Sequence, residues 1–101
     1  MNLVKLEDID KDRKFWKGER FRVQGVGMTV PDNGMDFYDY MLVDLPWESS
    51  YLFLINVTSG NNKAGSLMAA VETTGASDTK CINREGLTNA IGEVGVFYIE
   101  E

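Results

Sequence analysis

The chain has 101 residues, which is the size of one folding unit, and we expect a single domain over residues 1–101. Hydrophobic residues make up 44% and charged residues 26%, which excludes a disordered composition, and the formal net charge of −6 disfavours binding to nucleic acid. The complete absence of histidine excludes Ser-His-Asp and Cys-His catalysis, and the single cysteine, Cys81, excludes an internal disulfide.

The first segment of the chain carries charges of both signs. Asp8, Asp10, Asp12 and Glu19 have the spacing of positions 1, 3, 5 and 12 of a calcium-binding loop, but Arg13 occupies the position that requires glycine. We therefore expect a solvated segment here and leave open whether these four carboxylates bind a cation.

Three aromatic residues are interleaved with the lysines and arginines of the same segment. Phe15, Trp16 and Phe21 among basic side chains are typical of a surface that stacks on nucleic acid bases. Because carboxylates lie in the same segment and the whole chain is acidic, we favour partly buried aromatic residues beneath an ordinary charged surface.

Alternating polar and apolar residues predict strands from residue 19 onward. Residues 19–30 and 36–45 flank the turn sequence Pro31-Asp32-Asn33-Gly34, which predicts that these two strands form a hairpin. The apolar positions change parity within the first of them, which predicts a β-bulge at Gly25 or Gly27.

Three further strands and a tail are expected after the hairpin. Residues 51–58 are apolar on both faces up to Ile55, which predicts a core strand covered on both sides, on one of them by a helix. Residues 66–73 form the next strand after a glycine- and asparagine-rich loop, and 80–82 form a short strand. Residues 96–99 add a last strand or a docked tail.

A helix is predicted over residues 84–94. Asn83 is a suitable N-cap, Glu85 complements the helix dipole, and Gly95 is expected to end the helix. The expected buried stripe consists of Leu87, Ala90, Ile91 and Val94. Together these elements predict an α+β fold in which an antiparallel β-sheet of about five strands carries one C-terminal helix on one face.

An acidic and aromatic block is the strongest candidate for a functional surface. No lysine or arginine lies between Arg22 and Lys63, so this stretch is expected to attract basic partners. Tyrosine and tryptophan are favoured anchors in protein interfaces. Asp39 shares a strand face with Phe37, Met41 and Val43, so either this face is open at its edge or Asp39 has a partner. An edge strand protected by charge against aggregation is the alternative interpretation. The expected contact residues are Asp32, Asp36, Tyr38, Asp39, Tyr40, Asp44, Trp47 and Glu48.

The layout of the chain resembles that of a known class of small proteins. The segment Cys81–Val94, the segment Phe15–Phe21 and the acidic, strand-rich middle resemble the immunity proteins of bacterial polymorphic and contact-dependent growth inhibition toxin systems. The resemblance implies a cytoplasmic protein that binds and neutralises a cognate toxin domain, often a basic nuclease, through acidic residues.

These observations predict a binding protein rather than an enzyme. No run of apolar residues is long enough to span a membrane, the first ten residues do not have the pattern of a signal peptide, and no cofactor or metal site is expected. We expect a cytoplasmic immunity protein that is a monomer or weak dimer when free, with no nucleic-acid or membrane partner. The alternative is a structural or assembly protein, phage- or secretion-associated, that acts by self-association. A third hypothesis, a carboxylate-based hydrolase, would need two acidic side chains that face each other across a pocket.

Overall fold

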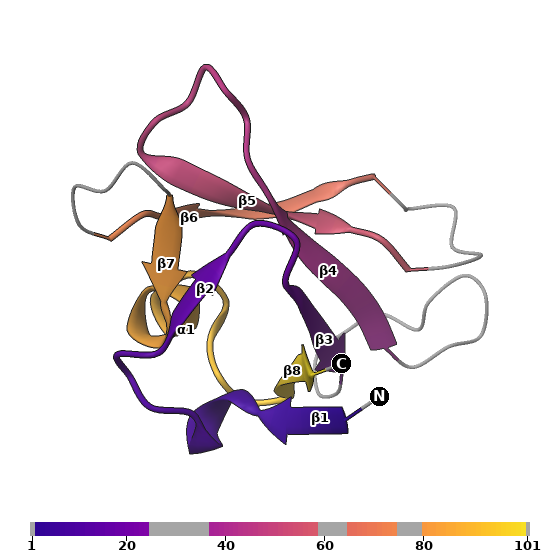
Figure 1. The fold of residues 1–101 in the computed structure, drawn as a ribbon. Helices are drawn as coiled ribbons and strands as arrows, with labels where there is room; N and C mark the ends of the chain where they lie inside the picture. The colour runs from indigo at the N-terminus through magenta and orange to yellow at the C-terminus, as the bar shows by residue number, and fades with distance from the viewer. Residues whose placement is uncertain (1, 25–36, 59–64, 75–79, 101) are drawn as a thin grey trace.

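A computed structural model describes residues 2–24, 37–58, 65–74 and 80–100 (Figure 1). The described chain forms a six-stranded antiparallel sheet, a second sheet of two strands and one α-helix. The predicted α+β class, with an antiparallel sheet and one C-terminal helix packed against it, is confirmed. The elements are β1 (Asn2–Lys5), η1 (Leu6–Asp8), β2 (Lys14–Trp16), β3 (Arg20–Gln24), β4 (Phe37–Val43), β5 (Tyr51–Asn56), β6 (Leu67–Glu72), β7 (Cys81–Asn83), α1 (Arg84–Ile91) and β8 (Val96–Glu100).

The main sheet has the order β1-β8-β3-β4-β5-β6. Strands β3 to β6 follow one another in sequence and pair as antiparallel neighbours, so the predicted pairing of the strands on either side of Pro31 is confirmed. The turn itself and the expected bulge at Gly25 or Gly27 lie outside the described residues. Every second residue of β4 and β5 faces inward, and the paired Leu42 and Leu54 are fully buried.

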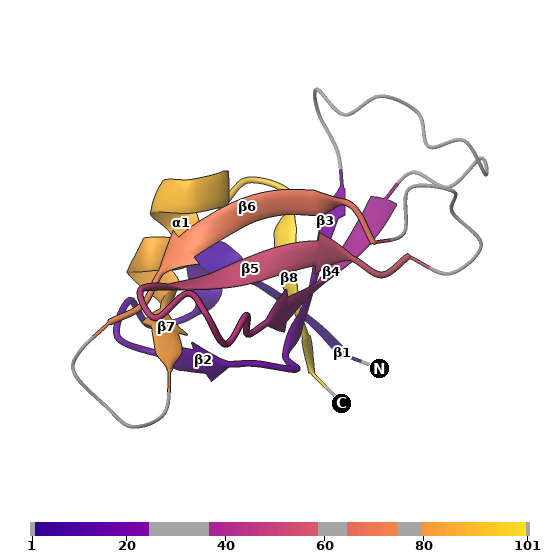
Figure 2. The same cartoon turned by 90° about the horizontal axis from the view of Figure 1, so that it is seen from above.

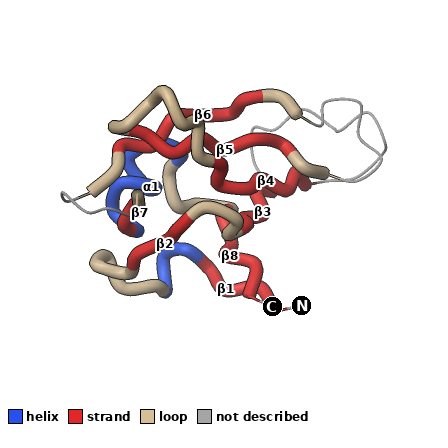
Figure 3. Tube along the Cα trace, turned by 45° about the horizontal axis from the view of Figure 1, so that its top comes forward, coloured by secondary structure: helices blue, strands red, loops and turns tan. Residues whose placement is uncertain are grey.

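The last strand lies in the interior of the sheet. β8 pairs with β1 on one side and with β3 on the other, so the first and last strands of the chain lie side by side (Figure 3). Strand β1 was not predicted, because its four residues are too few for an alternating pattern to be recognised. The sheet therefore has six strands where about five were expected.

A second sheet of two strands contributes buried side chains to the core. β2 pairs with β7 in antiparallel fashion, and Phe15 and Ile82, which lie opposite each other, are both fully buried. The short strand near residues 80–82 was predicted, but β2 was expected to be part of a solvated segment, which is wrong. Phe15 stacks edge-on against Phe21 of the main sheet with a centroid separation of 5.0 Å, so it belongs to the core.

The helix is shorter than predicted. The Asn83 side chain accepts a hydrogen bond of 2.7 Å from the Gly86 amide, which confirms the N-cap. However, α1 ends at Ile91, because Gly92 takes a φ of 80° that breaks the helical path before Gly95. Val94, expected on the buried stripe, is 81% exposed for the same reason.

Strand β5 is covered less completely than its sequence indicated. Leu52 and Leu54 are buried on the inner face, whereas Phe53 and Ile55 on the outer face are only half-buried and Tyr51 is exposed. Helix α1 packs on β6 and β7, at one end of the sheet (Figure 2). The predicted core strand is confirmed, because β5 lies between β4 and β6 and contributes Leu52 and Leu54 to the core, but the expected covering of both of its faces is wrong. Within the described residues, no helix has the length and apolar character needed to cross a membrane.

Candidate functional site

The two tyrosines expected at the contact surface are core residues. Tyr38 and Tyr40 lie on the inward-facing positions of β4 and are 9% and 8% exposed. Their rings are 6.4 Å apart, and burial, followed by the proximity of Tyr38, raises the pKa of Tyr40 above its ordinary value. Because successive side chains of a strand point to opposite faces of the sheet, alternate residues of β4 face the hydrophobic core. The prediction that these two side chains contact a partner is corrected by their burial.

Asp39 is neutralised by a cation from the neighbouring strand. The Arg22 guanidinium donates to both carboxylate oxygens of Asp39, over 2.8 Å from Nε and 3.2 Å from Nη2, and stacks on the Phe37 ring at 3.8 Å. The β3–β4 register places Arg22 directly opposite Asp39. Asp39 therefore has a partner, and the alternative of a charge-protected edge strand is wrong, because β4 is interior to the sheet.

Asp44 is likewise paired with a distant lysine. The Lys80 ammonium donates to Asp44 Oδ1 over 2.6 Å and to the backbone carbonyls of Leu45, Glu48 and Tyr51. The loop between β4 and β5 is thus folded around one cation. We call residues 44–51 the Trp47 loop. The stretch between Arg22 and Lys63 contains no lysine or arginine. In the folded chain, however, Arg22 and Lys80 form ion pairs with Asp39 and Asp44 of this stretch.

The remaining predicted contact residues divide into two pairs. Asp32 and Asp36 lie outside the described residues. Trp47 is 80% exposed, and the half-buried Glu48 accepts a hydrogen bond of 3.2 Å from the Ser50 amide. Of the eight predicted contact residues, the Trp47 loop thus keeps Trp47 and Glu48 available at the surface.

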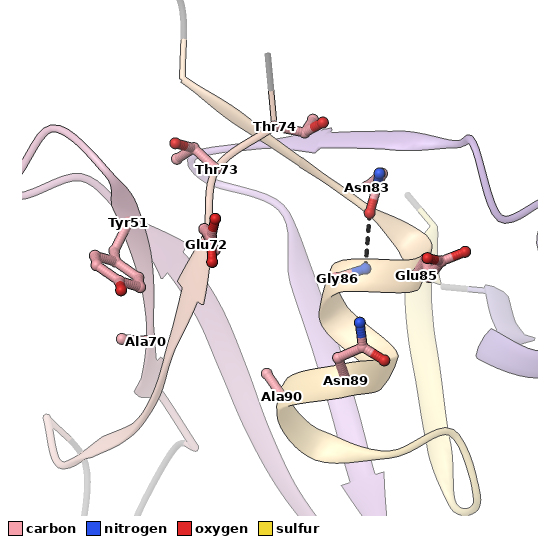
Figure 4. Close-up of a pocket in the computed structure, with 10 residues that line it drawn as sticks. All are labelled: Tyr51, Ala70, Glu72, Thr73, Thr74, Asn83, Glu85, Gly86, Asn89 and Ala90. Atoms are coloured by element: carbon pink, nitrogen blue, oxygen red, sulfur yellow. Dashed lines mark hydrogen bonds between the residues drawn. The ribbon is translucent and has the colours of Figure 1, made fainter. Parts of the chain in front are cut away.

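A groove that the sequence did not indicate lies between strand β6 and helix α1. Figure 4 shows Tyr51 and Glu72 on the strands and Glu85 and Asn89 on the helix. Glu72 and Glu85 are exposed, and neither has a cationic partner among the described residues. No described residue that lines the groove is basic. We call it the acidic groove, and its lining consists of Tyr51, Ala70, Glu72, Thr73, Thr74, Asn83, Glu85, Gly86, Asn89 and Ala90.

Local geometry determines how close the two walls of the groove approach. Tyr51 and Glu72 are direct cross-strand partners, so their side chains stand on the same face of the sheet. A Cβ at Gly86 would lie 3.8 Å from the Glu72 carbonyl oxygen, an ordinary contact distance, so the first turn of α1 packs directly on β6. For Glu85 the sequence indicates only a favourable interaction with the helix dipole. The packing of α1 on β6 places Glu85 on the helix side of the groove, whose strand side carries Glu72 and Tyr51.

The Trp47 loop leads directly into Tyr51, the first residue of β5, which lines the acidic groove. The Ser50 carbonyl, at the end of the loop, accepts hydrogen bonds from the Thr73 amide at 2.8 Å and the Thr73 hydroxyl at 3.1 Å. Tyr51 and Thr73 both line the groove. The loop that carries Trp47 therefore adjoins the acidic groove at Ser50 and Tyr51.

The acidic residues of the N-terminal segment do not converge on one point. The Glu19 carboxylate accepts hydrogen bonds from the Trp16 amide at 2.8 Å and the Tyr98 hydroxyl at 2.6 Å, and it lies 3.9 Å from the Arg13 guanidinium. Both oxygens of the Glu19 carboxylate are thus hydrogen-bonded to groups of the fold itself. In the described part of the chain, no group of three or more histidine, cysteine, aspartate or glutamate side chains could hold a metal ion.

The aromatic residues of the same segment contribute mainly to packing. Phe15 and Phe21 are fully buried, and the Arg13 guanidinium covers the rings of Phe15 and Tyr98 at 5.0 and 4.9 Å. Trp16 alone of the three predicted aromatic residues is exposed. The free thiol of Cys81 is buried.

Comparison of the chain with protein-family models, with curated proteins and with solved structures finds no match in any of the three.

Proposed function

We propose that this chain is an immunity protein that binds a basic toxin domain in the cytoplasm and blocks its activity. The observation that carries the proposal is the acidic groove, where Glu72, the cross-strand neighbour of Tyr51, and Glu85 on the facing helix are exposed and have no cationic partner among the described residues. Carboxylates without internal partners are available to a basic surface, and the net charge of −6 adds a long-range attraction. The acidic groove thus replaces the β4 residues as the proposed contact surface.

The chemistry of the groove suits occlusion of a partner. A toxin that acts on nucleic acid needs basic side chains to bind phosphate groups. Carboxylates that bind those basic side chains compete with the phosphate groups of the nucleic acid. The hydroxyl groups of Tyr51 and Thr73 and the amide group of Asn89 can form further hydrogen bonds with the partner. Under this proposal, binding alone inhibits the toxin and no reaction by the chain is required.

The first test is genetic and biochemical. Each open reading frame on either side of the gene for this chain is expressed alone and together with it. The proposal expects one neighbour to arrest growth when expressed alone, and to be tolerated and to co-purify with this chain when both are expressed. If no neighbouring product is toxic, or if toxicity persists on co-expression, the proposal is refuted.

The second test examines the acidic groove in the complex. Replacing Glu72 and Glu85 with glutamine should lower the association rate about tenfold at low salt and reduce the salt dependence of binding. The control replaces Glu7 and Glu100, two exposed carboxylates on η1 and β8, with glutamine and so removes the same charge elsewhere. Equal effects of the two double variants would assign the attraction to net charge rather than to the groove.

One observation favours self-association as a second candidate. β6 is the terminal strand of the sheet and carries Leu67, which is 59% exposed, and the exposed Met68. Terminal strands with apolar side chains can pair with a second copy of the same strand. Light scattering over a range of micromolar concentrations separates the candidates, since a stable oligomer that is dispersed by Leu67→Lys would favour assembly.

A further inference from the structure

The side chain of Trp47 presents an unusual exposed apolar surface. Its exposed fraction of 80% is the largest of any aromatic residue in the described chain, whereas the second tryptophan, Trp16, is 41% exposed. Tryptophan offers a large apolar area at a low cost in conformational entropy, and it is enriched among the residues that dominate binding energy in interfaces. A ring so placed contributes little to the core of its own protein.

The backbone that carries this ring is fixed by several hydrogen bonds. The three N–H donors of the Lys80 ammonium are shared among the Asp44 carboxylate and three loop carbonyls. The Glu48 amide donates to the Leu45 carbonyl at 2.9 Å, which closes a turn around residues 45–48. Because the loop is already ordered, little further entropy is lost when its exposed ring is bound.

The charges around the loop indicate what kind of surface can meet it. Glu48 lies next to Trp47, and the loop ends at Tyr51, which lines the acidic groove with Glu72. Anionic lipid surfaces are repelled by such surroundings, whereas a basic protein surface is attracted. A single ring at the margin of a charged surface fits an apolar pocket bordered by lysine or arginine.

We infer that Trp47 is the apolar anchor of the interaction surface and inserts into an apolar pocket on the basic partner protein, while the acidic groove meets the basic side chains beside that pocket. This inference rests on the proposed function and names the residue that holds the complex together. Lys80 acts as a positioning residue, since the hydrogen bonds described for its ammonium group go to residues 44–51. The groove governs how fast the partner arrives, and Trp47 governs how slowly it leaves.

The experiment measures binding of a catalytically inactivated form of the toxin domain encoded beside this gene. Trp47→Ala should weaken binding about 30-fold or more, mainly through faster dissociation, as expected for a dominant interface residue. The matched control is Val94→Ala, which removes an equally exposed apolar side chain, at 81%, from the segment between α1 and β8. This control should change the affinity by less than about twofold.

A spectroscopic measurement locates the ring itself. In a Trp16→Phe variant, Trp47 is the only tryptophan, so its fluorescence reports directly on its surroundings. The emission should shift to shorter wavelength on addition of the toxin domain, and it should stay unchanged with phosphatidylcholine or phosphatidylglycerol vesicles. A shift with vesicles would overturn the inference in favour of a membrane contact.

The outcomes separate the two proposals. If the unmodified chain binds the toxin domain and Trp47→Ala binds within about threefold of it, the anchor is refuted while the proposed function stands. If the unmodified chain does not bind, both fail. Loss of affinity in Trp47→Ala with an unchanged circular dichroism spectrum and unchanged Val94→Ala binding supports the anchor.

Discussion

Replacing Lys80 with methionine should destabilise the protein, because it removes the cation around which the Trp47 loop is folded. Methionine retains most of the aliphatic stem and removes only the ammonium group. The change leaves the Asp44 carboxylate and the carbonyls of Leu45, Glu48 and Tyr51 without their common donor. The loss is therefore electrostatic rather than one of packing.

The magnitude follows from the exposure of the ion pair. A hydrogen bond to a charged group contributes about 1.5–3 kcal/mol when shielded from water, and an exposed ion pair contributes about 0–1 kcal/mol. The side chains of Lys80 and Asp44 are 20% and 31% exposed, which places this pair between those limits. We expect a loss of about 1.5 kcal/mol for Lys80→Met, which corresponds to a melting temperature lower by about 6–12 °C in a domain of this size.

The assay is urea denaturation followed by far-ultraviolet circular dichroism, with Lys5→Met as the control. Lys5 is exposed on β1, so its replacement should change the free energy of unfolding by less than about 0.5 kcal/mol. Asp44→Asn should lie between the two, because the carbonyl acceptors of Lys80 remain. A change for Lys80→Met within the range of the control would refute the conclusion that the loop is organised by this cation.

Three further changes test the fold. Tyr98→Phe removes the hydrogen bond to Glu19 and should lower the free energy of unfolding by about 1 kcal/mol at neutral pH. That hydrogen bond, then burial, raises the pKa of Tyr98 above its ordinary value of 10.0. Its stabilising effect is therefore fully present below pH 10 and is lost as pH rises through the folded-state pKa, so urea titrations at increasing alkaline pH should show the gap between the variants closing. Asn83→Ala should lower the free energy of unfolding by about 1 kcal/mol through loss of the N-cap, whereas Asn89→Ala, exposed on the same helix, should have little effect in the same titration. Leu54→Ala, at a fully buried position, should lower it by about 2–5 kcal/mol, and retention of wild-type stability would contradict the assigned core.

Local patterns in the sequence account for most of the secondary structure. Alternation predicted β3 and β4, a run that is apolar on both faces predicted β5, the preceding loop predicted β6, and the capping residue Asn83 predicted where α1 begins. The end of the helix was misplaced, because Gly92 and Gly95 both permit a positive φ and a sequence pattern does not distinguish which one the chain uses. Both are described with positive φ in the structure.

The candidate site was predicted less well, because the charges that neighbour a residue in the sequence differ from those that surround it in the folded chain. Asp39 and Asp44 come from a segment without cations, yet strand pairing and the return of the chain at β7 bring Arg22 and Lys80 to them. The tyrosines of β4 were expected at the surface. Alternation predicts two faces of a strand, but not which face is covered when both carry aromatic side chains.

By itself the sequence determined the acidic charge, the α+β class and the antiparallel pairing of the sheet, because these depend on composition and on local periodicity. Only the tertiary structure decided that β8 lies between β1 and β3, which acidic residues are neutralised and which remain available. Those properties depend on contacts between residues far apart in the chain. The acidic groove is one such property, since Tyr51, Glu72 and Glu85 come from three separate elements that meet only after folding.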